Sequence, residues 1–467
     1  MPVVDRDKAR SDLTAILGIN AYHGDASAAL VVDGQLTAAA EEERFNRIKH
    51  AAGFPAEAVR YVVSASGVSP ADVQLVAVAR DPWARFLRKA MYALRMPSMA
   101  KTRVQVQDRF AAIANEVAGA LGQSAERITV RRIEHHRAHL ASAFLVSPFD
   151  EAALFSVDGL GDFASAMWGV GRGNRIERGG SVTFPHSLGI FYTALTQYLG
   201  FPKYGDEYKV MGLASYGEPE YLDEFRKIVT TTSNGEIGFR LGFDYFIHQK
   251  AGIAMTWEGG EPSVGRLYSD HLAARLGKAR DAAEDIEQRH KNIAASMQRR
   301  LEEVLLDRLR ALQVRTGMRK LCLAGGVAFN CVANGKILEH TGFDEVYVQS
   351  AAGDAGLAIG AAMQVWNESL GNRRDFVMEH SYWGPEFSEE QIRDYLAARS
   401  ADIGRQACEV RKIDNEDELC RLTAESIARG EVVGWFQGRM EWGPRALGNR
   451  SILADPRRPE MRDILNA

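Results

Sequence analysis

The chain has 467 residues, of which 46% are hydrophobic and 25% are charged, and its formal net charge is -4 at pH 7. This length predicts a globular protein of two or three domains, and the charge argues against a nucleic-acid-binding surface. Four cysteines without Cys-x-x-Cys spacing argue against a disulfide framework or a zinc cage. The N-terminus lacks the apolar core of a signal peptide, and no apolar run is long enough for a membrane span. We therefore expect a cytoplasmic protein.

Two stretches of the chain repeat one pattern of strand, Gly- and Asp-containing turn, strand and hairpin. In the first, predicted strands 15–19 and 28–32 flank the turn 20–27; in the second, predicted strands 153–157 and 165–170 flank the turn 158–162. The repetition predicts a duplicated α/β fold in which two equivalent turns face each other across a cleft. Actin-like and sugar-kinase-like ATPases hold phosphate with such paired turns.

Histidines dominate the run Glu134 to His139, which follows a predicted strand at 128–133 and precedes an alanine-rich helical pattern at 140–146. On a helix, His135 and His139 lie one turn apart on the same face, where two imidazoles can share one metal ion. The alternative is a polar strand-to-helix corner with solvated histidines.

Asp354 follows a predicted strand and opens an Ala- and Gly-rich helix. It either caps that helix or supplies the third ligand of a His-His-Asp site with open coordination positions. His23, in the turn 20–27, can act as a general base near neutral pH, or it bonds only to its own loop. Gly325 and Gly326 follow the predicted strand 320–324; they either let a ligand approach the backbone or form a tight turn.

The C-terminal part begins after a long amphipathic helix predicted over 281–313, with its apolar stripe in the core, and a charged linker at 370–383. A new α/β segment starts near Gly384. It contains Arg439, Arg445 and Arg450 among glycines, a proline and aromatic residues, which favours a pocket for phosphate or carboxylate over a solvated charged face.

Taken together, these segments resemble the NodU/CmcH/TobZ family of O-carbamoyltransferases. The matching pieces follow the family's order and cover nearly the whole chain: GINAYHGDASAALVVDG, AAAEEERFNRIKH, EHHRAHLASAF, VDGLGD, YKVMGLASYG, LAGGVAFNCVANGKI, GDAGLAIG and GRMEWGPRALGNRSILADPR. The resemblance implies a TsaD-like domain of the actin/hexokinase superfamily over 13–375, with lobes of about 13–150 and 151–375. A YrdC-like α/β domain would follow over 380–467, and it would be incomplete because family members usually continue further.

The resemblance also implies a reaction. The YrdC-like part would make carbamoyladenylate from carbamoyl phosphate and ATP with Mg²⁺, and the TsaD-like part would pass the carbamoyl group to an acceptor hydroxyl. By match to the family's motifs, His135, His139 and Asp354 would bind Fe(II) or another divalent metal, and His23 would be the base. The residues expected around the adenylate are Asp158, Gly159, Lys209, Gly325, Gly326 and Asn330. Arg439, Arg445 and Arg450 would bind carbamoyl phosphate and nucleotide.

We therefore expect an ATP-dependent O-carbamoyltransferase that acts on a hydroxyl of a small natural product, such as an antibiotic, or of a sugar-containing metabolite. We expect no nucleic-acid or membrane partner, and the oligomeric state stays open, with a homodimer as one option. A threonylcarbamoyladenosine-type enzyme acting on tRNA would share the first domain, but it would favour a basic surface. A non-catalytic actin-like ATP-binding scaffold would need neither His23 nor the metal trio.

Overall fold

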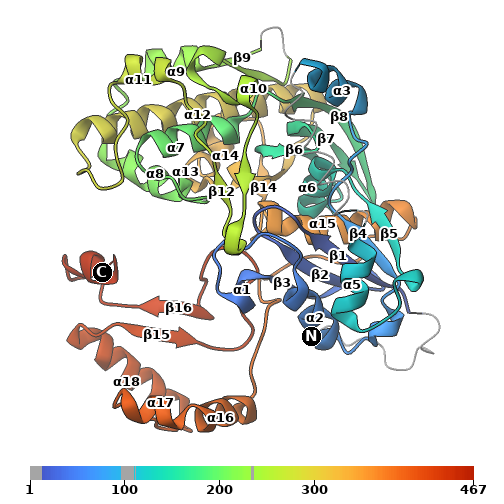
Figure 1. Cartoon of the computed structure of the whole chain (residues 1–467), viewed down its shortest axis with the longest axis vertical. Helices are drawn as coiled ribbons and strands as arrows, with labels where there is room; N and C mark the ends of the chain where they lie inside the picture. The colour runs from blue at the N-terminus through green and yellow to red at the C-terminus, as the bar shows by residue number, and fades with distance from the viewer. Residues whose placement is uncertain (1–12, 96–109, 111, 233–235, 467) are drawn as a thin grey trace. The chain divides into compact units, whose positions relative to one another are not determined.

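The computed structural model describes residues 13–95, 110, 112–232 and 236–466, and the chain divides into two compact units, 1–379 and 380–467. The first unit contains two five-stranded sheets, and the second contains a two-stranded sheet with helices (Figure 1). Among the described residues, no helix combines the length and apolar character that crossing a bilayer requires.

The two five-stranded sheets have the same topology, which confirms the predicted duplicated α/β fold. In each sheet, the first three strands along the chain form an antiparallel meander. On its other side, the first strand pairs in parallel with the fourth strand, which in turn pairs in parallel with the fifth. The order is β3-β2-β1-β4-β5 in one sheet and β8-β7-β6-β13-β14 in the other. The strands are β1 (Ala15–Asn20), β2 (Ser27–Val32), β3 (Gln35–Glu41), β4 (Leu75–Val78), β5 (Thr129–Arg132), β6 (Glu151–Gly161), β7 (Ala164–Arg172), β8 (Arg175–Thr183), β13 (Lys320–Ala324) and β14 (Glu345–Tyr347).

Strand β6 is longer than the predicted strand 153–157 and runs through most of the predicted turn 158–162. Its ladder with β7 is irregular there, because the pairing passes from Val157 opposite Ala166 directly to Gly161 opposite Ala164. Asp158 therefore lies in an irregular part of the strand. Such irregularities re-aim side chains and are common next to active sites.

Helices α6 (His135–Phe144) and α15 (Leu357–Gln364) pack against each other, and α15 also packs on β1 (Figure 1). The backbones touch: a Cβ atom on Gly360 of α15 would collide with the carbonyl oxygen of Ala138 in α6. A Cβ atom on Gly18 of β1 would likewise collide with the carbonyl oxygen of Ala358. The glycines in these two elements are thus required for the close approach.

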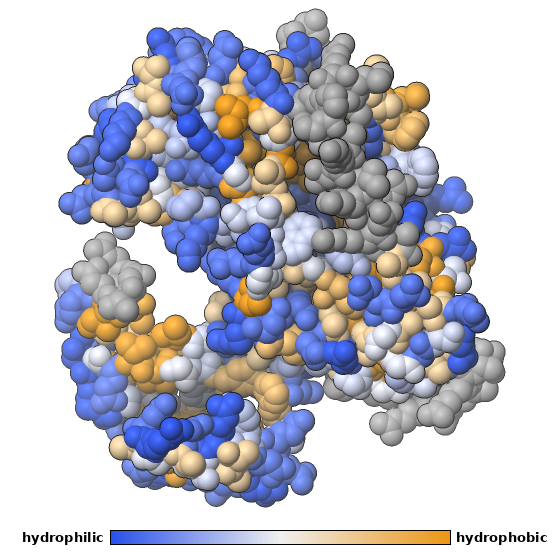
Figure 2. Space-filling view, in the orientation of Figure 1, coloured by the Kyte–Doolittle hydropathy of each residue, from blue (hydrophilic) through white to orange (hydrophobic). Residues whose placement is uncertain are grey.

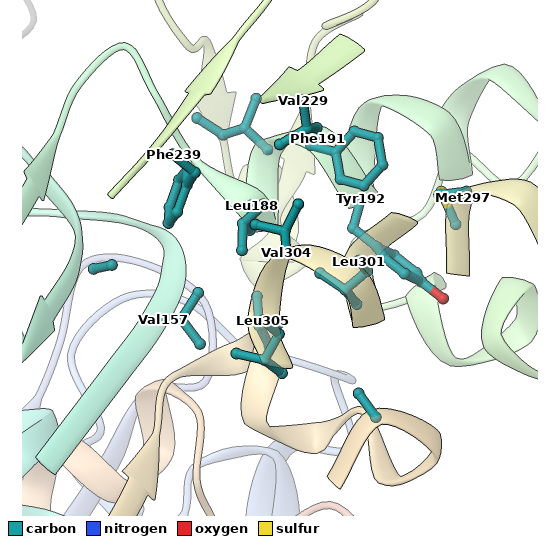
Figure 3. Close-up of a cluster of buried hydrophobic side chains, with 14 of the residues drawn as sticks. Val157, Leu188, Phe191, Tyr192, Val229, Phe239, Met297, Leu301, Val304 and Leu305 are labelled. Carbon is teal, nitrogen blue, oxygen red and sulfur yellow. The ribbon is translucent and has the colours of Figure 1, made fainter. Parts of the chain in front are cut away.

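A large apolar core lies between the second sheet and helices α7 (Leu188–Tyr198) and α12 (Gln288–Thr316) (Figure 3). The predicted apolar stripe of α12 is buried in this core: Ile293, Met297, Leu301, Val304, Leu305, Leu309 and Leu312. The helix begins later than predicted, where His290 Nδ1 accepts a hydrogen bond of 3.0 Å from the backbone N–H of Glu287. A smaller core covers the first sheet.

The other elements of the first unit are short. Its helices are α1 (Glu43–Asn46), α2 (Ala56–Ser66), α3 (Phe86–Arg95), α5 (Ile113–Leu121), α8 (Glu207–Leu213), α9 (Leu222–Ile228), α10 (His248–Ala251), α11 (Asp270–Leu276), α13 (Cys331–Asn334) and α14 (Ile337–His340). Two small antiparallel pairs follow α9 along the chain: β9 (Val229–Thr231) with β10 (Phe239–Leu241), and β11 (Met255–Thr256) with β12 (Ser263–Val264).

The second unit contains one antiparallel pair, β15 (Val433–Phe436) with β16 (Arg450–Leu453). Its helices are α16 (Glu389–Ala398), α17 (Ser400–Arg405), α18 (Glu416–Arg429) and α19 (Met461–Asn466). Trp442, between the strands, is fully buried and anchors the Arg-containing loop. The exposed face of this unit carries mixed hydrophilic and apolar side chains (Figure 2).

The contact between α6 and α15 predicts the effect of Gly360→Ala. The added methyl group must displace the α6 backbone, and overpacking of this kind typically costs about 1–3 kcal/mol. Gly119→Ala is the matched control, because Gly119 is an exposed residue of α5 with open space at its Cβ position. The control should stabilise the helix by about 0.5–1 kcal/mol. Thermal unfolding of the two variants should therefore shift in opposite directions, and a Gly360→Ala variant as stable as wild type would contradict the close contact.

Candidate metal centre and active site

Helix α6 presents two buried imidazoles from one face. Glu134 caps the helix by accepting a hydrogen bond of 2.7 Å from the backbone N–H of Arg137, so the helix begins at His135. His135 and His139 follow one turn apart, and the Nε2 atoms lie 3.2 and 3.4 Å from the same oxygen, Asp158 Oδ2. The helical period alone therefore places both imidazoles toward one point.

Two carboxylates from the second half of the unit complete the group. Asp158 comes from β6, and Asp354 comes from the 3-10 turn just before α15. Asp354 Oδ1 lies 3.5 Å from His135 Nε2 and 3.3 Å from His139 Nε2. One ligand atom from each of the four residues lies within 4.8 Å of the others. Asp158, which the sequence analysis grouped with the nucleotide residues, thus faces both histidines.

The charges of this group are strongly coupled. Burial alone would raise the pKa of Asp158, but hydrogen bonds from His135 and His139 hold it well below its ordinary value. Burial and the charge of Asp158 would raise the pKa of Asp354, but the neighbouring imidazoles lower it. Burial opposes protonation of His139, yet hydrogen bonds to the two carboxylates raise its pKa to about 9. Both carboxylates are therefore ionised, and they attract positive charge.

The residues fit a divalent transition metal. Asp354 Oδ1 is buried and faces two imidazole nitrogens, His135 Nε2 at 3.5 Å and His139 Nε2 at 3.3 Å. Ligands bound about 2.0–2.2 Å from one metal ion stand roughly 3–3.5 Å apart, which is the spacing of these nitrogens and oxygens. Two imidazoles and two carboxylates suit Fe(II) and related divalent ions.

His23 lies beside this group, in the turn between β1 and β2. Its Nδ1 atom is 3.0 Å from Asp354 Oδ2, and its ring centroid is 5.8 Å from that of His135. Asp354 therefore connects His23 to the metal-binding group through its second oxygen. When Nδ1–H is donated to Asp354, Nε2 is the nitrogen that can accept a proton.

His136, between the two candidate ligands, points elsewhere. Its Nδ1 atom lies 2.9 Å from Ser156 Oγ, and the ring is fully buried. Burial and the neighbouring His135 and His139 hold its pKa well below the ordinary value of 6.5. His136 is thus a neutral residue that packs beneath the group.

The backbone around Asp158 forms the glycine-lined turn that the sequence indicated. Asp158 Oδ1 accepts a hydrogen bond of 3.0 Å from the backbone N–H of Gly326. Gly325 adopts φ of 92°, and a Cβ atom there would collide with the backbone of β6. Ser187 Oγ donates a 2.6 Å hydrogen bond to the carbonyl of Gly159. The structure therefore brings Asp158, Gly159, Gly325 and Gly326 together.

Asn330 and Lys209 have other direct partners. Asn330 is buried; its Oδ1 caps α13 and accepts from Gln298, and its Nδ2 donates to Gln298 over 2.8 Å. Its side chain is thus engaged within the protein and can support a ligand site only by positioning backbone. Lys209 Nζ pairs with Asp206 Oδ1 over 2.7 Å.

The three arginines that were predicted to bind carbamoyl phosphate and nucleotide lie in the second unit and differ in exposure. Arg439 donates to the carbonyl oxygens of Trp383 (2.7 Å) and Gly384 (3.2 Å), so its guanidinium braces the unit. Arg445 is exposed in the loop, and Arg450 is half-buried on β16. The sequence analysis did not single out Glu441. This buried residue accepts hydrogen bonds from the backbone N–H groups of Leu447 (2.6 Å) and Asn449 (2.9 Å) and thereby shapes the loop.

Asp162 was not among the predicted site residues, and it supports the helix that carries His135 and His139. Asp162 Oδ2 accepts hydrogen bonds from the backbone N–H groups of His135 (3.0 Å) and Asp81 (2.8 Å). It fixes the first turn of α6 to the loop after β4. The only sequence signal for Asp162 was its position at the end of the turn 158–162. Its hydrogen-bond partners lie far away in the sequence and come next to it only in the fold.

The pKa of His139 predicts how stability depends on pH in the metal-free protein. Because this pKa is raised from 6.5 to about 9, the stability that protonation contributes is complete below pH 6.5 and is lost as pH rises through about 9. In EDTA, the urea midpoint should fall over this range, and the fall should be smaller in His139→Gln. Metal affinity should instead rise with pH, because the metal replaces the proton. A urea midpoint that stays constant over this range would contradict the assignment.

Comparison with known proteins places the chain in a family. Residues 15–363 match the model "Carbamoyltransferase N-terminus", and residues 424–467 match "Carbamoyltransferase C-terminus". An uncharacterized protein of Synechocystis sp. is 39% identical over 97% of this chain and 73% of its own length. Nodulation protein NolNO of Sinorhizobium fredii is 35% identical over 96% of this chain and 61% of its own length. This chain therefore spans 73% and 61% of these relatives. The ROK hexokinase of Thermus thermophilus aligns over 77% of this chain and all of its own, with 13% identity and a TM-score of 0.37. The matches over both ends show that the chain belongs to the carbamoyltransferase family.

Proposed function

We propose that this protein transfers a carbamoyl group, activated as carbamoyladenylate, to a hydroxyl of a small natural product or sugar-containing metabolite. The observation that carries the proposal is the shared carboxylate of Asp354, which faces His23 with one oxygen and His135 and His139 with the other. A candidate base and a candidate metal site therefore lie on opposite sides of one residue. The net charge of -4 favours a small acceptor over tRNA.

His23 activates the acceptor. An alcohol is a weak nucleophile, so a positioned base assists its attack. Nε2 of His23 takes the hydroxyl proton while Asp354 holds Nδ1–H and stabilises the imidazolium that forms. The acceptor oxygen bonds to the carbamoyl carbon, the bond from that carbon to the adenylate phosphate oxygen breaks, and AMP leaves with the bonding electrons.

His135, His139, Asp158 and Asp354 would hold Fe(II) or a related divalent metal. When bound, such a metal supplies Lewis-acid polarisation or orientation of the reacting group. Asp354 also orients His23, because its second oxygen lies 3.0 Å from His23 Nδ1. We assign the adenylate to the turn at Gly325 and Gly326, where the lack of side chains lets a ligand approach the backbone. The N–H groups of these two residues donate to Ala352 O and Asp158 Oδ1.

The second unit belongs to the domain that we expect to form the carbamoyl donor. We assign transfer to residues 13–375 and carbamoyladenylate formation, from carbamoyl phosphate and ATP with Mg²⁺, to a domain that includes 380–467. We assign carbamoyl phosphate and nucleotide to Arg439, Arg445 and Arg450 of that domain, because guanidinium groups bind phosphate bidentately.

Mass spectrometry tests the proposed reaction. The protein is incubated with Fe(II), Mg²⁺, ATP, carbamoyl phosphate and a panel of hydroxylated sugars and natural products, with bulk tRNA in a parallel reaction. A panel compound heavier by one carbamoyl group supports the proposal. A modified tRNA, or no modified product despite bound metal and nucleotide, would favour the tRNA enzyme or the scaffold instead.

Three variants separate the roles of base and metal ligand. We expect His23→Gln to lower kcat by about 10²–10⁴-fold while metal content stays normal, because general-base assistance has that size. His135→Ala should lose both metal and transfer. His340→Gln, an exposed histidine at the end of α14, is the control and should retain both. Metal analysis and product formation are measured together; normal turnover in His23→Gln would remove the proposed base.

A further inference from the structure

The turn that carries His23 has a conformation that must be held from outside. Tyr22 and Asp25, on either side of His23, have φ values of 64° and 60°. Residues other than glycine rarely adopt this left-handed backbone conformation, and they keep it only when surrounding contacts fix them. The position of His23 therefore depends on the contacts of its neighbours.

One neighbouring segment, residues 50–53, runs along this turn. The backbone N–H groups of Tyr22 and Ala26 donate to the carbonyl oxygens of Gly53 (2.9 Å) and Ala51 (2.8 Å). The side chains add a further contact: His50 Nδ1 lies 2.7 Å from Asp25 Oδ1. This contact fixes the residue two positions after His23.

The pair is ionic. Burial alone would lower the pKa of His50, but the hydrogen bond and charge of Asp25, with the charge of Glu43, raise it. Asp25, Glu43 and His50 lie close enough to enclose a cation, but Glu43 is already paired with Arg44.

The opposite face of the His50 ring meets the segment before α8. The ring packs edge-on against Tyr204 at 5.3 Å, and a Cβ atom on Gly205 would collide with His50 Nε2. Tyr204 also lies over the turn itself, since a Cβ atom on Gly24 would come within 2.8–2.9 Å of its phenol ring and hydroxyl. Nε2 of His50 is buried and has no hydrogen-bond partner among the described residues. The two ring nitrogens of His50 therefore face the protein, Nδ1 toward Asp25 and Nε2 toward Gly205, although the side chain is 16% exposed.

We propose that His50 is a positioning residue, which clamps Asp25 against the 204–205 segment and thereby keeps His23 on Asp354. The inference rests on the proposed function, in which His23 is the base. Because the 204–205 segment leads into α8, the clamp also joins the His23 turn to the part of the chain that carries Lys209.

Nitrogen-15 NMR of the histidine side chains tests the clamp without requiring turnover. The zinc-loaded, diamagnetic protein is compared in wild type, His50→Ala and His50→Asn, and His23→Gln assigns the His23 signal. In wild type, the Nδ1–H of His23 should be held on Asp354 and protected from exchange. We expect His50→Ala to lose this protection, and His50→Asn to restore part of it, because its amide can replace Nδ1.

Kinetics with a panel compound that wild type carbamoylates provide the second readout. His50→Ala should lower kcat by about 10²-fold, the size expected for misplacement of a catalytic group, with the acceptor KM changed less than about 2-fold. Metal content should stay normal. His248→Ala is the matched control, since buried His248 bonds to the carbonyl of Pro185 outside the site, and it should lower stability only.

The outcomes are distinguishable. An unchanged His23 signal in His50→Ala, or a loss of stability without any change in kcat, would overturn the clamp. If wild type carbamoylates no compound while His50→Ala still alters the His23 signal, the proposed function fails and the clamp on His23 remains.

Discussion

The close backbone contact between α6 and α15 is the constraint on which the candidate metal centre depends. Gly360 lets α15 lie directly against Ala138 of α6, and Gly18 lets β1 lie against Ala358. Helix α6 supplies the two imidazoles, the turn before α15 supplies Asp354, and β1 leads into the His23 turn. A displacement at either contact would therefore move the nitrogen and oxygen atoms that lie within 4.8 Å of one another in this group.

Electrostatics explains why these groups are kept together. Two buried carboxylates repel each other, and each would be costly to bury without a positive partner. Protonated His139 provides that charge in the metal-free protein, and a divalent ion would provide more of it. The same attraction raises the pKa of His50, which lies beside Asp25 and Glu43. Two groups of acidic and basic side chains therefore lie around His23, the candidate metal site and the contact of His50 with Asp25.

The residues of the candidate site fall into two groups, those suited to contact reactants and those that hold other residues in position. His23 and the four metal-site residues are suited to contact reactants, whereas Asp162, His50 and the amide of Asn330 act on their neighbours. In the second unit, Glu441 has the corresponding role, because its carboxylate shapes the loop of Arg445 through backbone N–H groups. Substitution of such a residue should change the rate of transfer by displacing its neighbours, while the residues that contact the reactants stay the same.

Features that follow from local periodicity and from the order of motifs could be predicted from the sequence. The spacing of His135 and His139 places them on one face because the α-helix repeats every 3.6 residues, and the repeated strand-turn-strand pattern predicted the duplicated fold. Ordered motifs pointed to the carbamoyltransferase family. The orientation of Asp158 toward the histidines could not be predicted in this way, since Asp158 lies in the irregular part of the ladder of β6 with β7. The contact of His50 with Asp25 and Gly205 likewise arises only in the tertiary structure, since these residues lie far apart along the chain. Such contacts arise from packing between segments, and local sequence carries no periodic signal for them.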